Sequence, residues 1–279
     1  MNKRVILVIV HYGDIATTKK CIDSITKYSK IFHIIVVNND QRVELRKSHF
    51  QKEHISIIQN RENTGFARGV NSGIKEALSL SPDYILLLNN DTWVKNDILK
   101  PLLNFAEINT DAGIIAPVIA FQKSSELLFD FGGKVNWTFG RTTHTNKTKI
   151  TSLKTRRVEY ASGCCMLLKK QVINKVGMFD ERFFLYYEDV DYCLRAKKLG
   201  FYTFVVPSSV VFHHLSHSVG KVSTLAAYHL TKSALIFGKK YITWRILNVG
   251  FVAIQCLQFF FKNRKSGIYA FSALFTNIF

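Results

Sequence analysis

Short apolar runs alternate with helical patterns through the first half of the chain. The runs lie at residues 4–10, 31–40, 55–60, 84–88 and 113–120, and the helical patterns lie at 17–28, 66–80 and 97–108. Apolar runs without polar alternation are typical of strands that are buried on both faces. We therefore predict an α/β fold with a doubly wound, mostly parallel sheet flanked by helices.

The first apolar run has two interpretations. It follows Lys3 and Arg4, and a basic start before an apolar run is typical of a signal peptide. The run ends at Val10, however, and Asp14 follows without a small-residue cleavage site. We therefore predict a buried first strand.

The character of the sequence changes in the second half. Residues 141–157 are basic and rich in threonine, which predicts an exposed, mobile loop, and the residues at 158–170 predict a further strand. We predict one domain over 1–235 and a C-terminal helical extension, both apolar and basic, over 236–279.

The extension leaves three alternatives open. Asn248, Gln255 and Gln258 interrupt its apolar stretch, which falls short of the ~20 apolar residues of a membrane-spanning helix. It could form a spanning helix, helices packed on the domain, or helices lying at a membrane surface. Basic flanks combined with tryptophan and phenylalanine favour the membrane surface.

The chain is strongly basic, with a formal net charge of +18. No Asp or Glu follows Asp191, so the excess of positive charge is concentrated in the last third. Three kinds of partner suit such a surface: nucleic acid, an anionic membrane, or phosphorylated substrates. The sequence contains no helix-turn-helix, RNA-binding or zinc-finger pattern, which argues against a specific nucleic-acid site.

The five cysteines are an odd number without the spacing of metal ligands. Cys164 and Cys165 are adjacent and poorly placed to bridge each other. We interpret all five as reduced thiols of a cytosolic protein.

Polar residues follow four of the predicted strands, at residues 11–14, 38–40, 60–63 and 89–91. Ligands of open α/β sheets bind beyond the carboxyl ends of the strands, so these residues predict a shared crevice. Asp91 could hold a divalent cation there, or it could simply begin the next helix. His213, His214 and His217 could likewise be metal ligands or ordinary loop residues.

The segment FFLYYEDVDYCLRAKKLG, residues 183–200, joins an aromatic run to three carboxylates. Acidic residues suit the first turn of a helix, and Asp191 and Arg195 have the spacing of an ion pair on one helix face. A helix start alone does not explain why the aromatic run directly precedes the acids.

Eight segments occur in order between about residues 4 and 220: VIVHYGD, IIVVNND, NTGFARGVNSGI, YILLLNNDTWV, FGG, YASGCCMLLKK, GMFDERFFLYYEDVDYCLRAKKLG and VVFHHLSHS. Together they resemble the family-2 inverting glycosyltransferases, in particular the bacterial rhamnosyltransferase-like branch. The resemblance implies the GT-A fold.

The resemblance also implies a metal site and a nucleotide-sugar site. It assigns a divalent metal, Mn²⁺ or Mg²⁺, to Asp91 and His213, with His214 as the alternative to His213. Asn89 stands where the family's pattern usually has a first aspartate, so one possible ligand is replaced. The residues assigned to the nucleotide sugar are His11, Tyr12, Asn38, Asn39, Asn63, Gly65, Arg68, Asn71, Asn89, Asn90 and Gly163.

The catalytic base implied by the resemblance lies in the Glu188–Asp189 motif. We assign the base to Asp189 and expect Glu188 to orient the acceptor, while Asp191 stabilises the helix start. Phe184, Tyr186 and Tyr187 could offer flat surfaces to a sugar ring.

The expected function is the metal-dependent, inverting transfer of a sugar, rhamnose being the best guess, from a nucleotide-diphosphate donor. The expected acceptor is a glycan or lipid-diphosphate-linked glycan of bacterial surface polysaccharide synthesis. The expected location is cytoplasmic, peripheral on the inner face of the cell membrane. The alternatives are a non-catalytic nucleotide-sugar or glycan-binding protein of the same fold and, from charge alone, a nucleic-acid-binding protein.

Overall fold

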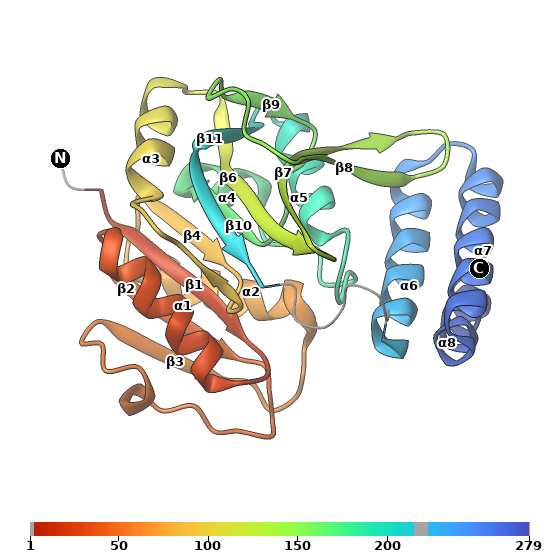
Figure 1. Cartoon of the computed structure of the whole chain (residues 1–279), viewed down its shortest axis with the longest axis horizontal. Coiled ribbons are helices and arrows are strands. Elements are labelled where there is room, and N and C mark those ends of the chain that lie inside the picture. The colour runs from red at the N-terminus through yellow and green to blue at the C-terminus, as the bar shows by residue number, and fades with distance from the viewer. Residues whose placement is uncertain (1–2, 215–222, 279) are drawn as a thin grey trace.

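The structure, a computed structural model, describes residues 3–214 and 223–278. It consists of a central sheet with helices on both faces, followed by three C-terminal helices (Figure 1). The strands are β1 (Val5–His11), β2 (His33–Asn38), β3 (Ile55–Gln59), β4 (Tyr84–Leu88), β5 (Thr92–Trp93), β6 (Ala112–Lys123), β7 (Glu126–Asn136), β8 (Arg141–Lys147), β9 (Arg156–Val158), β10 (Cys165–Lys169) and β11 (Tyr202–His213). The helices are α1 (Ile15–Tyr28), α2 (Gly65–Ser79), α3 (Leu99–Ile108), α4 (Lys170–Val176), α5 (Glu188–Lys198), α6 (Thr224–Tyr241), α7 (Arg245–Lys262), α8 (Arg264–Asn277) and the 3₁₀ helix η1 (Lys47–His49).

The sheet has the strand order β3-β2-β1-β4-β10-β6-β11-β5. The first four strands are parallel, β6 and β11 are parallel to each other, and β10 lies antiparallel between β4 and β6. The prediction of a mostly parallel sheet flanked by helices is confirmed, and so is the buried first strand. The carboxyl ends of β1, β2 and β4 therefore meet at one edge of the sheet.

Alternate side chains of β1 enter two separate hydrophobic cores. Ile6 and Val8 pack on the side of α2, and Leu7 and Ile9 pack on the side of α1 and α3. Because both faces are covered, the strand reads as a continuous apolar run in the sequence.

The prediction of a mobile loop over residues 141–157 is wrong at both ends of the segment, while residues 148–155 between them contain no strand or helix. This segment contains β8, which pairs with β7, and β9, which pairs with β11. Most side chains of β8 are exposed, so the strand lacks the apolar positions from which a buried strand is predicted. The strand predicted over 158–170 is likewise shorter, because β10 covers only Cys165–Lys169.

The C-terminal helices pack on one another and on the α/β domain. The predicted boundary between residues 235 and 236 falls inside α6. Asn248 on α7 donates to the Phe139 carbonyl of the turn between β7 and β8, and Ser233 on α6 donates to the Leu185 carbonyl. Among the described residues, no helix has the length and hydropathy needed to span a membrane.

Candidate functional site

Two cavities lie next to each other at the carboxyl edge of the sheet. The strand-end cavity has a volume of about 500 Å³ and is lined by residues that include Tyr12, Asn39, Asn63, Gly65, Asn90 and Asp91. The acidic cavity has a volume of about 330 Å³ and is lined by residues that include His144, Gly163, Tyr186, Glu188, Asp189 and His213. Phe66, Asn89 and Leu185 line both cavities, so the two share a wall.

The ends of β1, β2 and β4 supply the polar lining of the strand-end cavity, as the sequence predicts. The amide nitrogen of Asn90 donates to the Tyr12 carbonyl at 3.1 Å and to the Thr18 hydroxyl at 3.0 Å, which connects the ends of β4 and β1. The Asn39 side chain donates to the Gly65 carbonyl at 2.7 Å, so it also fixes the loop that precedes α2.

Four residues assigned to the nucleotide sugar do not line either cavity. Asn38 is buried, and its amide donates to the Val43 carbonyl and to Gln59. His11 is also buried; its Nδ1 lies 2.6 Å from the Thr18 hydroxyl, and its Nε2 has no hydrogen-bond partner among the described residues.

Arg68 and Asn71 hold the segment before α5 instead. Arg68 pairs with Glu181 at 2.9 Å. Asn71 donates to Glu181 and to the Phe179 carbonyl and accepts from the Phe179 amide, so both ends of its side chain are occupied. These two residues therefore position the loop that carries the aromatic run.

Gly65 allows this aromatic loop to approach α2. Its φ is +80°, and a Cβ at this position would lie 2.5 Å from the Phe184 carbonyl oxygen. That carbonyl accepts a hydrogen bond from the Phe66 amide at 2.7 Å. Any larger residue at position 65 would separate the two segments that form the wall between the cavities.

The aromatic run then turns sharply into α5. Tyr186 and Tyr187 both have left-handed backbone conformations, with φ of 70° and 68°. Such conformations cost about 1 kcal/mol or more each in non-glycine residues and persist only where the surroundings enforce them. The buried Tyr187 ring and its hydroxyl, which donates to the Gly140 carbonyl, hold the turn that directs Glu188 and Asp189 at the acidic cavity.

The predicted aromatic surface is only partly available. Phe184 lines the strand-end cavity and stacks on His229 of α6 at 4.1 Å between ring centroids. Tyr186 is the most exposed of the run and lines the acidic cavity. Phe183 is fully buried in the core.

Asp189 is held by backbone groups. Its Oδ2 accepts from the Gly163 amide at 2.8 Å, and its Oδ1 accepts from the Val190 amide at 2.8 Å. Glu188 is buried, and its Oε2 has no hydrogen-bond partner among the described residues. Burial raises the pKa of both carboxyls, and the Asp189 charge raises the pKa of Glu188 further. Asp189 accepts from two backbone amides, which favour its charged form over that of Glu188.

Asp91 and His213 meet where the two cavities adjoin. His213 Nε2 lies 3.0 Å from Asp91 Oδ1. Burial lowers the pKa of His213, and the neighbouring Cys164 and Asp91 raise it overall. His214 lines the strand-end cavity, and its backbone amide donates to the Asp91 carbonyl. His217, the third member of this histidine cluster, lies outside the described residues.

The donor set around Asp91 fits a divalent cation. The carboxylate of Asp91 and the imidazole of His213 are oxygen and nitrogen donors of the kind that Mn²⁺ accepts. The nearby Asn89 Oδ1 is buried without a hydrogen-bond partner in the described chain. Residues 3–214 and 223–278 contain no cluster of three or more His, Cys, Asp or Glu that could hold a metal ion.

Sequence reasoning missed the walls that come from β8 and α6. His144 and Thr142 of β8 line the acidic cavity, Leu230 of α6 lines it too, and Leu225 of α6 lines the strand-end cavity. No sequence signal marked these residues, because β8 has no apolar pattern and α6 was divided by the predicted domain boundary. The first C-terminal helix is thus part of the site.

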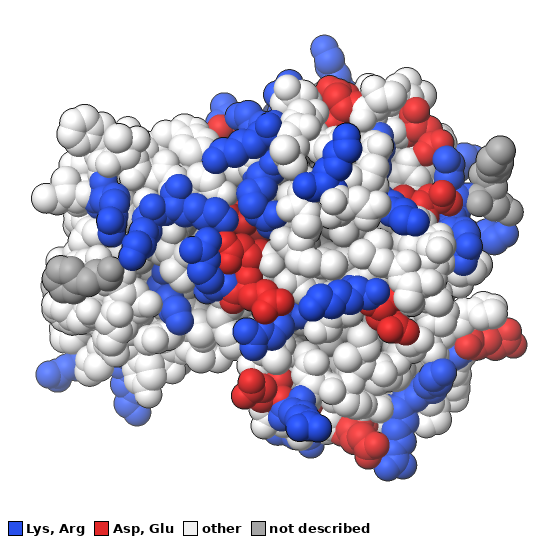
Figure 2. Space-filling view, turned by 180° about the vertical axis from the view of Figure 1, so that it is seen from behind, with Lys and Arg blue, Asp and Glu red and all other residues white. Residues whose placement is uncertain are grey.

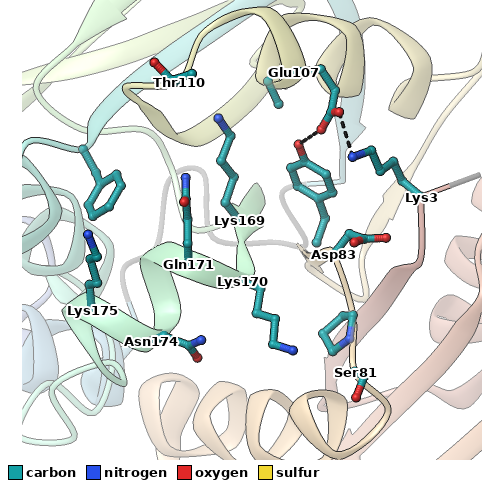
Figure 3. A pocket seen from close by; sticks show the side chains of 14 residues that line it. Lys3, Ser81, Asp83, Glu107, Thr110, Lys169, Lys170, Gln171, Asn174 and Lys175 are labelled. Atoms are coloured by element: carbon teal, nitrogen blue, oxygen red, sulfur yellow. Dashed lines mark hydrogen bonds and ion pairs between the residues drawn. The ribbon is translucent and has the colours of Figure 1, made fainter. Parts of the chain in front are cut away.

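The largest cavity described lies elsewhere, at the opposite end of β4. It has a volume of about 650 Å³ and is lined by Lys3, Asp83, Glu107, Lys169 and Lys170 among others (Figure 3). Its carboxylate Glu107 is already engaged, because it pairs with Lys3 at 2.7 Å and accepts from the Tyr84 hydroxyl. The paired carboxylates and the orphan polar atoms discussed above lie at the other edge of the sheet.

The comparison with protein families decides the class of the site. The sequence profile of Glycosyl transferase family 2 matches residues 6–177. The chain belongs to this family. The match covers β1 to β10 and the ends of β1, β2 and β4 that line the strand-end cavity, and it confirms the family predicted from the sequence.

Curated relatives of the chain include three bacterial transferases. The N-acetylglucosaminyl-diphospho-decaprenol L-rhamnosyltransferase of Mycobacterium tuberculosis (strain H37Rv) is 28% identical over 206 residues, which are 66% of this chain and 66% of that protein. The dTDP-rhamnosyl transferase RfbF of Shigella flexneri is 24% identical and covers 86% of this chain and 81% of its own. Rhamnosyltransferase WbbL of Escherichia coli K12 is 25% identical, and the match covers 76% of this chain and 84% of that protein.

Solved structures show the same fold. The crystal structure of GalNAc-T7 with UDP, GalNAc and Mn²⁺ superposes with a TM-score of 0.65 at 13% identity, over 83% of this chain and 47% of that one. Staphylococcus aureus TarS superposes with a TM-score of 0.56 at 14% identity, over 92% and 43% of the two chains. The predicted GT-A fold is therefore confirmed.

Proposed function

We propose that this protein transfers a sugar, with inversion at the anomeric carbon, from a nucleotide-diphosphate donor to a hydroxyl of a glycan or lipid-linked glycan in bacterial surface polysaccharide synthesis. The observation that carries the proposal is the adjacency of the two cavities, with Asp91 and His213 between them and Asp189 in the second. Rhamnose is the first candidate sugar, because three relatives carry the name of rhamnosyltransferases.

Asp189 is the proposed base. As the acceptor oxygen forms its bond to the anomeric carbon, the bond from that carbon to the diphosphate oxygen breaks, and the acceptor proton passes to the Asp189 carboxylate. The Gly163 and Val190 amides hold this carboxylate in place. Glu188, protonated beside it, can donate a hydrogen bond to the acceptor from Oε2, the oxygen for which the described chain offers no partner.

The strand-end cavity is the proposed site of the nucleotide diphosphate. Asn39, Asn63 and Asn90 line this cavity, and the polar groups of their side chains that are not engaged within the protein would meet the base and the ribose. A divalent ion held by Asp91 and His213 would neutralise the charge that develops on the leaving diphosphate. Binding of such an ion requires His213 to release its proton, so affinity for the ion falls at low pH.

The C-terminal helices are the proposed contact with an anionic membrane surface, on its cytoplasmic side. Residues 224–277 contain no acidic side chain, and at the end of the molecule formed by these helices Figure 2 shows blue basic groups without red ones. One face of α7 is apolar and exposed; this α7 stripe consists of Ile246, Ile254, Leu257 and Phe261. Arg245, Lys262, Arg264 and Lys265 lie at its two ends. An exposed apolar stripe with basic ends suits an anionic lipid interface.

Vesicle binding tests this contact. The double substitution Ile254→Ser and Phe261→Ser should abolish co-sedimentation with phosphatidylglycerol vesicles, since it removes two large apolar side chains from the stripe. Ile108→Ser is the matched control, because Ile108 is 81% exposed but lies on α3. Equal sedimentation of the double variant and wild type would contradict the proposal.

Calorimetric titration with UDP, dTDP and GDP, each with and without Mn²⁺, tests the donor site. We expect one nucleotide to bind tightly only when the ion is present, and this dependence to disappear in Asp91→Ala. Binding of none of the three would contradict the proposed transferase function.

A further inference from the structure

A second pair of a histidine and a carboxylate lies at the acidic cavity, which His213 also lines. His144 on β8 lines this cavity, and its Nδ1 lies 2.7 Å from Oδ2 of Asp130 on β7. Asp130 is buried, and its other oxygen accepts from the Gly132 amide at 2.9 Å. The Tyr160 ring packs edge-on against the imidazole at 5.2 Å between centroids. Since Nδ1 is engaged, Nε2 is the nitrogen left for a further partner.

A buried carboxylate bonded to a histidine fixes both the orientation and the charge of the ring. Burial alone would lower the pKa of His144, but the hydrogen bond and charge of Asp130, together with the charge of Asp189, raise it overall. Asp130 is buried but the His144 side chain is 40% exposed, so the pair is only partly removed from water and adds little to stability. Its position on the wall of the cavity suggests a role in the site.

The charges of His144 and Asp189 each shift the pKa of the other. The pKa of Asp189 is raised by burial and held down by its two backbone amides and by the charge of His144. The titratable groups in contact with His144 are Asp130 of β7 and Tyr160 before β10. Those that line the acidic cavity with it are Cys164, Tyr186, Tyr187, Glu188, Asp189 and His213. Of the two histidines that line this cavity, His144 is the one whose charge lowers the pKa of Asp189.

We propose that Asp130 and His144 form an ion pair built into the transferase site, in which Asp130 keeps the ring charged and oriented, and His144 holds Asp189 in its ionised, proton-accepting form. His144 is thus a positioning residue that acts through Asp189. The inference rests on the proposed function, and it adds a residue that the match to Glycosyl transferase family 2 does not assign.

Histidine-ring NMR titration tests the pair without any substrate. In the full-length protein, His144 should titrate at higher pH than His33, whose pKa is lowered by burial. Asp130→Asn should move the His144 titration to lower pH and leave that of His33 unchanged. A His144 titration at or below that of His33 would overturn the inference.

The pH dependence of nucleotide release from dTDP-rhamnose tests the effect on the base. Removing the positive charge in His144→Gln lets Asp189 bind its proton more tightly. The acidic limb of the rate profile should therefore move to higher pH, with a larger loss of rate at pH 6 than at pH 8. His144→Lys, which retains a positive charge, should move the limb back towards its wild-type position.

Failure of this inference can be distinguished from failure of the proposed function. If Asp189→Asn is inactive while the profile of a folded His144→Gln superposes on that of wild type, the inference is wrong and the proposed function stands. If Asp189→Asn retains wild-type activity, the assignment of the base itself is wrong. His49→Gln, on the distant helix η1, serves as the histidine control.

Discussion

The two sides of the first turn of α5 carry carboxylates with different surroundings. On the cavity side, Asp189 is held by backbone amides alone. On the core side, Asp191 is fully buried and has three side-chain partners: Arg195 at 2.8 Å, Lys240 at 2.5 Å and the Tyr241 hydroxyl at 2.7 Å. The charge of Asp191 is thus neutralised within the protein, whereas that of Asp189 is available to a substrate.

This difference shows that acidic residues at a helix start do not by themselves mark a catalytic site. The sequence pattern is the same for Asp189 and Asp191, two residues apart, and their surroundings differ because different elements supply their partners. Lys240 and Tyr241 come from the end of α6, so this helix stabilises the core side of α5. Leu230, also on α6, lines the acidic cavity.

The largest expected effect is that of Asp189→Asn on the rate. An amide cannot take the acceptor proton, and loss of a general base costs about 10²–10⁴-fold. The variant should retain its fold, since it removes a buried charge without a side-chain ion-pair partner. Nucleotide release from the donor, measured alongside urea unfolding, checks both parts; a rate within tenfold of wild type would contradict the role of Asp189.

Asp191→Ala should have the opposite effect from Asp189→Asn, because it should lower the stability of the fold. It leaves Arg195 and Lys240 without their shared carboxylate in a partly buried position, and breaking a buried ion pair costs about 3 kcal/mol. Urea unfolding measures this loss. The control is Glu44→Ala, which removes an exposed pair with Arg46 and should leave the unfolding curve unchanged. Equal midpoints for Asp191→Ala and wild type would refute the structural role.

Tyr241→Phe should cause a smaller loss of stability. It removes one of the three hydrogen bonds to Asp191 and leaves both cations in place, so the expected cost is about 1–2 kcal/mol. The same urea unfolding experiment measures it. A loss as large as that of Asp191→Ala would mean that the hydroxyl, rather than the two cations, dominates the neutralisation of Asp191.

The last test of the comparison uses the wild-type protein, with no residue substituted. It measures the acidic limb of the pH–rate profile. The pKa of Asp189 is raised by burial, so the base becomes protonated at a pH above the ordinary aspartate value of about 3.9. Activity should therefore fall on acidification while Asp189 gains its proton, with the fold intact by circular dichroism. A rate that stays constant down to that ordinary value would contradict the burial of the base.

The sequence predicts those parts of the site that depend on local patterns. Buried runs such as 84–88 identify strands, and polar residues at their carboxyl ends identify the crevice that contains Asn39 and Asp91. The pairing of Asp191 with Arg195 also follows from helical spacing and is confirmed.

The remainder depends on tertiary packing. The side chain of Arg68 pairs with Glu181, 113 positions away, so it holds a loop instead of facing the cavity. His144 enters the acidic cavity only because β8 pairs with β7, and its polar, exposed sequence gave no sign of a strand. Residues of this kind are brought together by contacts whose partners are distant in the chain.

The most direct test of the account measures binding and turnover in the same samples of wild type, Asp189→Asn and Asp191→Asn. Each is titrated with dTDP and Mn²⁺ by calorimetry and then assayed for nucleotide release from dTDP-rhamnose in the presence of Mn²⁺. We predict that Asp189→Asn binds dTDP within about twofold of wild type and releases almost no nucleotide, since ~10³-fold of the rate depends on the base. We also predict that Asp191→Asn lowers the stability of the fold more than it lowers the rate of nucleotide release. Full nucleotide release by Asp189→Asn, or loss of dTDP binding in that variant alone, would contradict the assignment of the catalytic base to the cavity side of α5.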